Sequence, residues 1–313
     1  GVRGAGMPGD VIAALVPVIV LIGAGHVLMR RAILSEAFWR QAEWLSYFVF
    51  LPALFVHGLA TADLSGLAIG RVFAVLCGSI LVTAGLLVAA RPWIGGDGAG
   101  FTSVFQGGIR FNNYVGVMLA TGLYGAEGTA LAALANAAIV PTVNALSVLA
   151  FARYGGARPG WGRMLRQLAG NPLLMSCVLG MALQQTGIGL PPGVAGTLGA
   201  LGQAALAVGL LCVGAGLMPA ALGQHLRPVA QASLFKFAVL PGVTFAAAWL
   251  AGLGGAEAVV VVMFHALPTA TSSYILARQL GGDTALMASI IAAQTLLGVL
   301  SIPAAVMLAG ALG

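Results

Sequence analysis

Long apolar runs alternate with short polar segments along the whole chain. Each run approaches the roughly 20 residues that a helix needs to cross the hydrocarbon core of a bilayer. The charge-poor runs predict ten membrane-spanning helices, at residues 11–29, 44–62, 72–90, 101–124, 128–152, 165–186, 195–222, 226–252, 258–277 and 284–312. The pattern therefore predicts an all-α polytopic membrane protein.

The ten runs divide into two sets of five around a segment rich in Gly and Arg. We predict a first five-helix repeat over residues 10–153, a cytoplasmic linker over 154–164 and a second repeat over 165–312. Because five is an odd number, the second repeat inserts with the opposite orientation, which makes the pair an inverted repeat. Residues 1–6 are interpreted as an expression remnant, and the first run is a span rather than a signal peptide, since it lacks a basic n-region.

Composition supports the membrane interpretation. The 313 residues are 60% hydrophobic and 7% charged, whereas an ordinary soluble domain carries about 25% charged residues. A water-solvated surface, a disordered chain and a disulfide scaffold are therefore excluded. The three cysteines lie in apolar runs and are expected to be reduced thiols.

The net charge of +6 reflects topology rather than a nucleic-acid partner. Thirteen of the fourteen basic residues are Arg, scattered at the ends of apolar runs without a cluster that could follow a phosphate backbone. Loops after odd-numbered runs hold ten of them and loops on the other side hold two. By the positive-inside rule the odd-numbered loops face the cytoplasm and both termini lie outside. We expect the protein to lie in the bacterial cytoplasmic (inner) membrane.

The fourth and ninth runs carry polar residues at mid-membrane depth. The fourth contains Gly107 and Gly108 before its charged and amide residues, and the ninth contains Pro268 among hydroxyls. Paired glycines weaken a helix and proline breaks one. Irregular backbone at that depth survives only where it lines an enclosed or watery cavity. Two breaks in corresponding positions predict a transport site, although Pro268 alone could simply kink its helix.

The same two runs contain the best internal match. Asn112-Asn113-Tyr114 is followed by a helical run and an acidic residue, Glu127, and Ser272-Ser273-Tyr274 is followed in the same way by Asp283. The alignment needs a gap of five residues. It supports the inverted repeat.

These segments resemble the auxin efflux carrier family, which includes bacterial malonate and malate permeases and the plant PIN auxin carriers. The resemblance rests on Arg110-Phe-Asn-Asn-Tyr-Val-Gly and on the segment from Pro268 to Asp283. It implies a fold like the bile-acid symporters and sodium/proton antiporters, with two unwound helices crossing at the site. It also implies a scaffold, often dimeric, made of the first two helices of each half, and a moving transport domain made of the others. One departure is that the PIN carriers have Pro at both crossings, whereas the fourth run here has none.

The polar residues at the two breaks are suited to an anion. The downstream half-helices should begin near Asn113 and Ser273, where free N–H groups and the positive end of the helix dipole favour negative charge. Arg110 is a counter-charge for the substrate or, alternatively, one half of an internal pair. Lys236 is a second anion contact, a proton-sensitive gate or a residue that extends to the interface, and His265 is a switch or a core histidine. The predicted substrate-binding residues are Arg110, Asn112, Asn113, Tyr114, Lys236, His265, Pro268, Thr269, Thr271, Ser272 and Ser273.

The predicted function is a secondary carrier of small organic anions, above all carboxylates, by elevator-type alternating access. No Asp or Glu lies deep within a predicted span, which disfavours a sodium/proton antiporter because that chemistry needs buried carboxylates. A sodium-coupled symporter remains the alternative, followed by a channel or receptor for an organic acid. Protease, nucleophile, metal and phosphate-binding motifs are missing from the sequence, so we expect no enzyme, cofactor or metal. The expected partners are the anion, the lipid bilayer, a proton or sodium as coupling ion, and a second copy in a homodimer.

Overall fold

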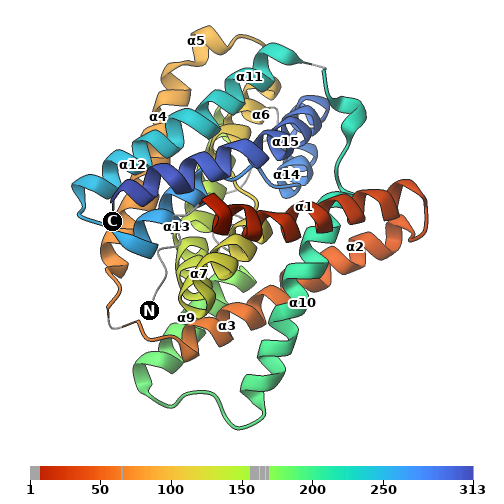
Figure 1. Ribbon diagram of the computed structural model, residues 1–313. Coiled ribbons are helices and arrows are strands. Elements are labelled where there is room, and N and C mark those ends of the chain that lie inside the picture. The colour runs from red at the N-terminus through yellow and green to blue at the C-terminus, as the bar shows by residue number, and fades with distance from the viewer. Residues whose placement is uncertain are drawn as a thin grey trace. The chain divides into compact units, whose positions relative to one another are not determined.

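The computed structural model describes residues 8–64, 66–155, 162, 166, 169–223 and 225–312 (Figure 1). Every regular element among these residues is a helix. The chain forms two compact units, each assembled from three separate stretches. Unit 1 comprises Gly1–Ile69, Asn113–Ala137 and Leu168–Gly216, and unit 2 comprises Gly70–Asn112, Ala138–Gln167 and Leu217–Gly313.

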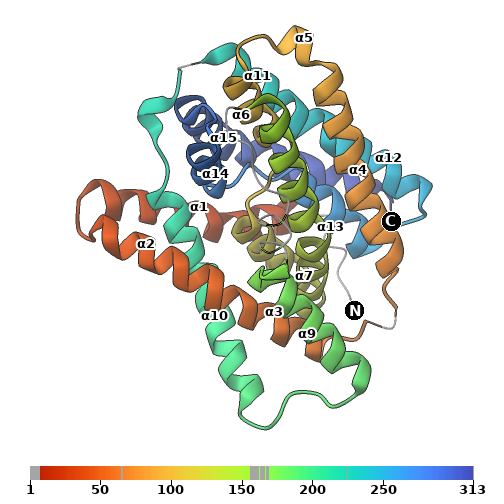
Figure 2. The same cartoon turned by 180° about the vertical axis from the view of Figure 1, so that it is seen from behind.

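Unit 1 is built around a long helix, α10, against which α1 and α3 pack, while α9 packs on α3 (Figure 2). Small residues allow the closest approach. A side chain on Gly25 of α1 would collide with the backbone of Leu211, and one on Gly214 of α10 would collide with the backbone of Ile22. Such close contact between helix backbones is typical of membrane helices. The elements are α1 (Pro8–Arg30), α2 (Glu36–Leu45), η1 (Ser46–Phe50), α3 (Leu51–Thr61), α9 (Pro172–Thr186), α10 (Val194–Ala215) and the first part of α7 (Asn113–Tyr154).

Unit 2 is centred on α6 and α15, which pack on each other and on α11. The helices α13 and α14 also pack on α15, and α12 packs on α13. The elements are α4 (Ile69–Ala89), α5 (Arg91–Ile94), α6 (Gly98–Ile109), the second part of α7, η2 (Pro219–Ala221), α11 (Leu226–Leu234), η3 (Phe235–Val239), α12 (Leu240–Leu250), α13 (Gly255–His265), α14 (Ser272–Leu280), α15 (Thr284–Ala309) and η4 (Gly310–Leu312).

Apolar side chains are exposed in continuous stripes. On α1, Ile12, Val16 and Val20 stand one helical turn apart and are 58%, 51% and 59% exposed. Each such side chain would cost about 25 cal/mol per Å² of apolar surface in water, and lipid removes that cost. The stripe therefore faces lipid.

Seven stretches of the described helices are long and apolar enough to cross a membrane. They are Gly9–Arg30, Glu36–Thr61, Ile69–Ala89, Gly98–Tyr154, Val194–Ala215, Leu226–Leu250 and Thr284–Leu312. The stretch Gly98–Tyr154 has 57 residues, far more than one crossing needs. The protein is thus a multi-pass membrane protein, and the count of ten stays a prediction.

The chain turns back within α7 at Gly125, which has φ 57° and ψ −130°. The hydroxyl oxygens of Thr121 and Thr129 lie 2.9 Å apart across this turn, whereas residues eight positions apart in a straight helix are separated by about 12 Å. Glycine adopts this backbone conformation at little cost. The boundary predicted between residues 124 and 128 is confirmed.

Pro52 does more than bend its helix. The π-helical turn η1 ends at Phe50, two positions before Pro52, and η3 ends at Val239, two positions before Pro241. A proline ring clashes with the carbonyl four residues earlier in an α-helix, and the wider π turn moves that carbonyl away. Both turns let the helices continue, as Glu36–Thr61 and Leu226–Leu250.

The two compact units draw helices from both predicted repeats. Unit 1 holds the regions of the first, second, sixth and seventh predicted runs, and unit 2 holds those of the third, eighth, ninth and tenth, while the fourth and fifth runs are divided between the units. One local feature agrees with the internal match: the stretches after Asn112 and Thr271 both end at a glycine of positive φ, Gly125 and Gly281. The inverted repeat and the limits 10–153 and 165–312 remain predictions. Most of the linker 154–164 and the whole of residues 1–6 lie outside the described residues.

Candidate functional site

Both predicted interruptions are present. The helix α6 ends at Ile109 and α7 begins at Asn113, while α13 ends at His265 and α14 begins at Ser272. Residues 110–112 and 266–271 thus lack regular helical structure. The two interruptions are the starting point for the site.

The first interruption begins at Arg110, two residues after the Gly107-Gly108 pair that was expected to break the helix. Gly107 and Gly108 are helical residues of the last turn of α6. A Cβ on Gly107 would lie 2.7 Å from Cγ2 of Ile290, and one on Gly108 would lie 2.8 Å from Cδ1 of Leu87. These glycines allow neighbouring helices to pack closely. They do not break the helix, so that part of the prediction was wrong.

A backbone hydrogen bond joins the two interruptions. The N–H of Asn112 donates to the carbonyl of Pro268 over 2.8 Å. Pro268 has no N–H of its own, but its carbonyl is available because α13 has already ended. Two segments of irregular backbone thereby satisfy part of their hydrogen bonding with each other, as is required at membrane depth.

Gln294 makes a second connection between the interruptions, and the sequence analysis missed it. This fully buried residue of α15 donates through Nε2 to the carbonyl of Gly107 over 2.9 Å. Its Oε1 accepts from the N–H of Thr269 over 3.0 Å. One amide thus satisfies a free carbonyl at the end of α6 and a free N–H of the second interruption. The signal in the sequence was a lone Gln in the middle of an apolar run.

Arg110 spans from the first interruption to the start of α14. Its Nη1 donates to Oδ1 of Asn144 over 2.8 Å, and its Nη2 donates to Oγ of Ser272 over 3.2 Å. Neither of these two partners carries a charge, and both Arg110 and Ser272 are only half-buried.

The start of α14 offers fewer free donors than the sequence suggested. The N–H of Ser273 bonds to the carbonyl of Ala270, and the N–H of Tyr274 bonds to the carbonyl of Thr271, both over 3.0 Å. The hydroxyls of Thr269 and Ser273 lie 3.2 Å apart and are buried. The positive end of the helix dipole remains, but most of the donors for a ligand have to come from side chains.

Two predicted site residues fall in unit 1. Asn113 begins α7 and its Oδ1 accepts the N–H of Tyr114 over 3.1 Å. The ring of Tyr114 lies against Gly209 of α10 in the same unit. The other nine predicted residues belong to unit 2.

Lys236 and His265 are fully buried in unit 2. Lys236 lies in the π turn η3, and His265 is the last residue of α13. An electrostatic interaction acts between them. Nδ1 of His265 lies 2.6 Å from Oγ1 of Thr244.

The predicted absence of acidic residues from the spans needs a correction in unit 1. Glu43 lies inside the stretch Glu36–Thr61, is half-buried and interacts electrostatically with Tyr114. The helix begins earlier than predicted because Ser35 caps it, so its polar first turns were not counted. In unit 2, Glu257 and Asp283 lie at helix starts, as predicted, and Asp97 is the N-cap residue of α6.

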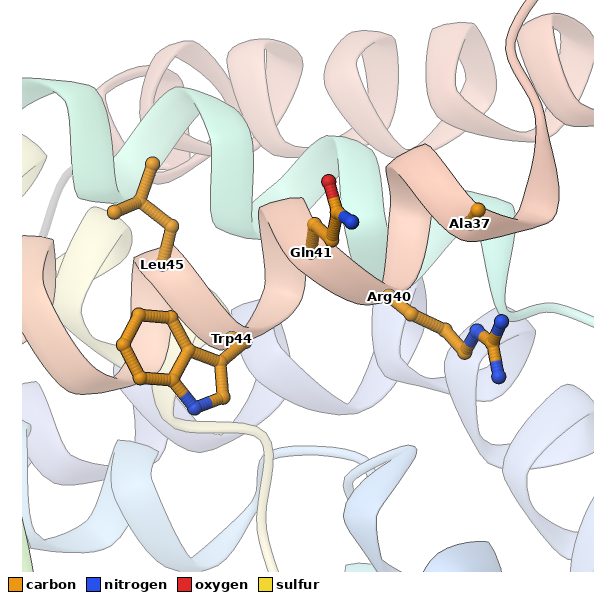
Figure 3. A pocket seen from close by; sticks show the side chains of 5 residues that line it. All are labelled: Ala37, Arg40, Gln41, Trp44 and Leu45. Carbon is orange, nitrogen blue, oxygen red and sulfur yellow. The ribbon is translucent and has the colours of Figure 1, made fainter.

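A separate surface pocket of 610 Å³ lies on α2 of unit 1 (Figure 3). Arg40 and Trp44, one helical turn apart, both extend from the helix there. The pocket includes no predicted site residue. Its lining residues are Ala37, Arg40, Gln41, Trp44 and Leu45.

Residues 162–306 match the model of a family described as "Membrane transport protein". An uncharacterized transporter of Methanothermobacter thermautotrophicus is 24% identical over 290 residues, which cover 91% of this chain and 94% of the relative. An uncharacterized transporter of Methanocaldococcus jannaschii is 28% identical over 195 residues, 60% of this chain and 62% of the relative. The chain is thus similar to membrane transporters over most of its length, which agrees with the resemblance to the auxin efflux carriers predicted from the sequence, and its long apolar helices make it a multi-pass membrane protein.

Proposed function

We propose that the protein is a secondary carrier of small organic anions, above all carboxylates, which bind at the two interruptions of unit 2. The observation that carries the proposal is the position of Arg110, whose guanidinium reaches from the first interruption to Ser272 at the start of α14. A cation inside a membrane protein is costly and is typical of a substrate pathway. A guanidinium also matches the planar geometry of a carboxylate.

The side chains proposed to bind the anion together with Arg110 are neutral hydrogen-bond donors. Asn112 is buried, and Thr271 and Ser272 are half-buried. Amides and hydroxyls donate to a carboxylate without adding a competing charge. We include Thr269, Ser273, His265 and Lys236 as further candidates, and Asn113 and Tyr114 of unit 1 stay predictions.

The make-up of the two units supports elevator-type transport. Unit 1 gathers the four predicted runs that the resemblance assigns to a scaffold, together with Asn113–Ala137 from the fourth and fifth runs. Unit 2 contains both segments joined by the Asn112–Pro268 hydrogen bond. A unit with its own packed core can move as a body without losing its binding geometry. The homodimer, the inner membrane and the outside termini remain part of the proposal.

Uptake of labelled malonate by purified protein in liposomes tests the function. With an inward-directed proton gradient imposed on the liposomes, we expect malonate to accumulate above its outside concentration with and without sodium, and we expect a loss of at least tenfold in Arg110→Gln. The matched control is Arg227→Gln, which removes an exposed Arg that donates to the carbonyl of Trp93 over 3.2 Å. Downhill flux alone would indicate a channel, and strict sodium dependence would indicate the sodium-coupled symporter.

A further inference from the structure

Unit 2 contains a buried basic pair. Lys236 is the only lysine of the sequence, and both it and His265 are 0% exposed. Nζ of Lys236 and Nε2 of His265 have no hydrogen-bond partner among the residues that the structure describes. Buried polar atoms without partners are rare in proteins and call for a role.

The hydrogen bonds of Thr244 fix the tautomer of His265. Oγ1 of Thr244 lies 2.6 Å from the carbonyl oxygen of Leu240, which can only accept, so the hydroxyl hydrogen is used there. Nδ1 of His265, 2.6 Å from the same Oγ1, therefore donates its own hydrogen. In the neutral ring this leaves Nε2 as a bare acceptor.

Close packing sets the π turn η3, which carries Lys236, beside the end of α6. The residue before it, Phe235, has its Cβ 3.3 Å from the position that a Cβ on Gly108 would take, and Ala232 meets Gly107 in the same way. The interaction with His265 connects Lys236 to the end of α13. The basic pair is therefore associated with both helix ends at which the interruptions begin.

The elements packed around the pair carry few titratable groups. The helices α6 and α15 contain none, and the chain continues from α6 directly into Arg110. On α13 the other titratable residue is Glu257 in its first turn, about 12 Å along the helix from His265. On α11 the titratable residue is Arg227, which is exposed. Neither Nζ of Lys236 nor Nε2 of His265 is hydrogen-bonded to an acidic side chain in the described part of unit 2.

We propose that Lys236 is the proton-binding residue of the carrier, so that the organic anion is transported together with one proton. The proposal rests on the proposed function, because the anion supplies the missing negative charge. An ammonium buried without a counter-charge is costly, which favours an uncharged Lys236 in the empty carrier. When the anion enters, Nζ takes a proton from water on the side of entry, and the bare Nε2 of His265 favours the ammonium through its partial negative charge.

Release reverses these steps. As the anion leaves, the ammonium loses its counter-charge and returns the proton to water on the side of exit. Binding of anion and proton is reciprocal, so each strengthens the other by the same factor. In the pH range in which Lys236 of the empty carrier is uncharged, the affinity for the anion falls about tenfold for each unit of pH increase.

The single lysine allows a direct test. Protein grown with lysine labelled at Cε, carrying a lysine-free tag, gives one lysine signal in NMR spectra of nanodiscs at pH 8. We expect the chemical shift of an amine in the empty protein and that of an ammonium after addition of malonate, succinate or malate. An ammonium signal in the empty protein, or an amine signal with the anion bound, would overturn the proposal.

Calorimetry in buffers of different ionisation enthalpy counts the protons. We expect about one proton taken up per anion by the wild type and by Arg227→Gln, and close to none by Lys236→Met. His265→Asn keeps a donor for Thr244 but lacks the Nε2 acceptor. We therefore expect the affinity of this variant for the anion to begin its fall with rising pH at a lower pH than in the wild type. Uptake of one proton by Lys236→Met would place the proton elsewhere and overturn the proposal, and if that variant does not fold, the lysine signal of the wild type decides.

The two proposals fail differently. Anion binding without proton uptake contradicts Lys236 as the proton site and leaves the proposed function intact. Failure of malonate, succinate and malate to bind or to be transported at any pH contradicts the proposed function and, with it, the proton site.

Discussion

The N–H of Asn112 donates a hydrogen bond to the carbonyl of Pro268 over 2.8 Å, although 156 positions separate the two residues in the sequence. Each belongs to a short segment between two helices, and neither segment could satisfy its backbone alone in the bilayer. The bond holds the two segments side by side within unit 2. The polar side chains that we propose to bind the anion depend on this arrangement.

Replacement of Gln294 by Leu should loosen both segments. The substitution leaves the carbonyl of Gly107 and the N–H of Thr269 without their partner, at about 1–3 kcal/mol for each buried group. We expect a lower midpoint of thermal unfolding in detergent and reduced malonate uptake. Gln185→Leu on α9, where the side chain is exposed, is the control and should unfold as the wild type does. An unchanged midpoint in Gln294→Leu would show that the amide is dispensable.

Asn112→Ala and Thr271→Ala should each weaken anion binding by about 1–3 kcal/mol, as expected when a buried charged acceptor loses a donor. The backbone bond from residue 112 to Pro268 is retained, because it needs only the N–H of Asn112. The double variant should be folded and nearly inactive. Calorimetry with malonate measures the effect, and full affinity in both single variants would move the site away from the interruptions.

Two glycines of unit 2 should respond in opposite ways to an added methyl group. Gly107→Ala puts the methyl 2.7 Å from Ile290, and overpacking of this kind costs about 1–3 kcal/mol. Gly85→Ala on α4 meets nothing within 4 Å and gains helix propensity. We expect the first variant to lower the unfolding midpoint and the second to leave it unchanged or raise it. Equal midpoints would contradict the packing role of Gly107.

Membrane orientation follows from the uneven distribution of Arg. In a background in which Cys77, Cys177 and Cys212 are replaced by Ala, single cysteines at the exposed positions 32 and 66 probe the first two loops. An impermeant thiol reagent added outside intact cells should label Gly66→Cys and spare Ala32→Cys until the cells are opened. The reverse pattern would invert the predicted topology.

The sequence was sufficient to predict the membrane class, the two interruptions and the reversal before Gly128, because each depends on local chemistry. Pro268 and the amides at 112 and 113 identify irregular backbone by residue type alone. The role of Gly107 and Gly108 could not be predicted in the same way, since a glycine that breaks a helix and one that admits Ile290 or Leu87 look alike in a sequence.

Contacts between residues far apart in the chain could not be predicted from the sequence either. Gln294 is an isolated amide on an apolar helix, and only the fold brings it to Gly107 and Thr269. The start of α2 was also missed, because the count of apolar residues began at Trp44 and the helix begins at Glu36. Glu43 was therefore placed outside a span that contains it.

The central claim is that Arg110 provides the charge that binds the anion. The most direct measurement is the dissociation constant of malonate for purified wild type, Arg110→Lys, Arg110→Gln and Arg227→Gln, with the unfolding midpoint of each recorded in parallel. The account predicts wild-type affinity in Arg227→Gln, weakened binding in Arg110→Lys, which keeps the charge but loses the planar fork, and a loss of at least tenfold in a folded Arg110→Gln. Wild-type affinity in Arg110→Gln would contradict it.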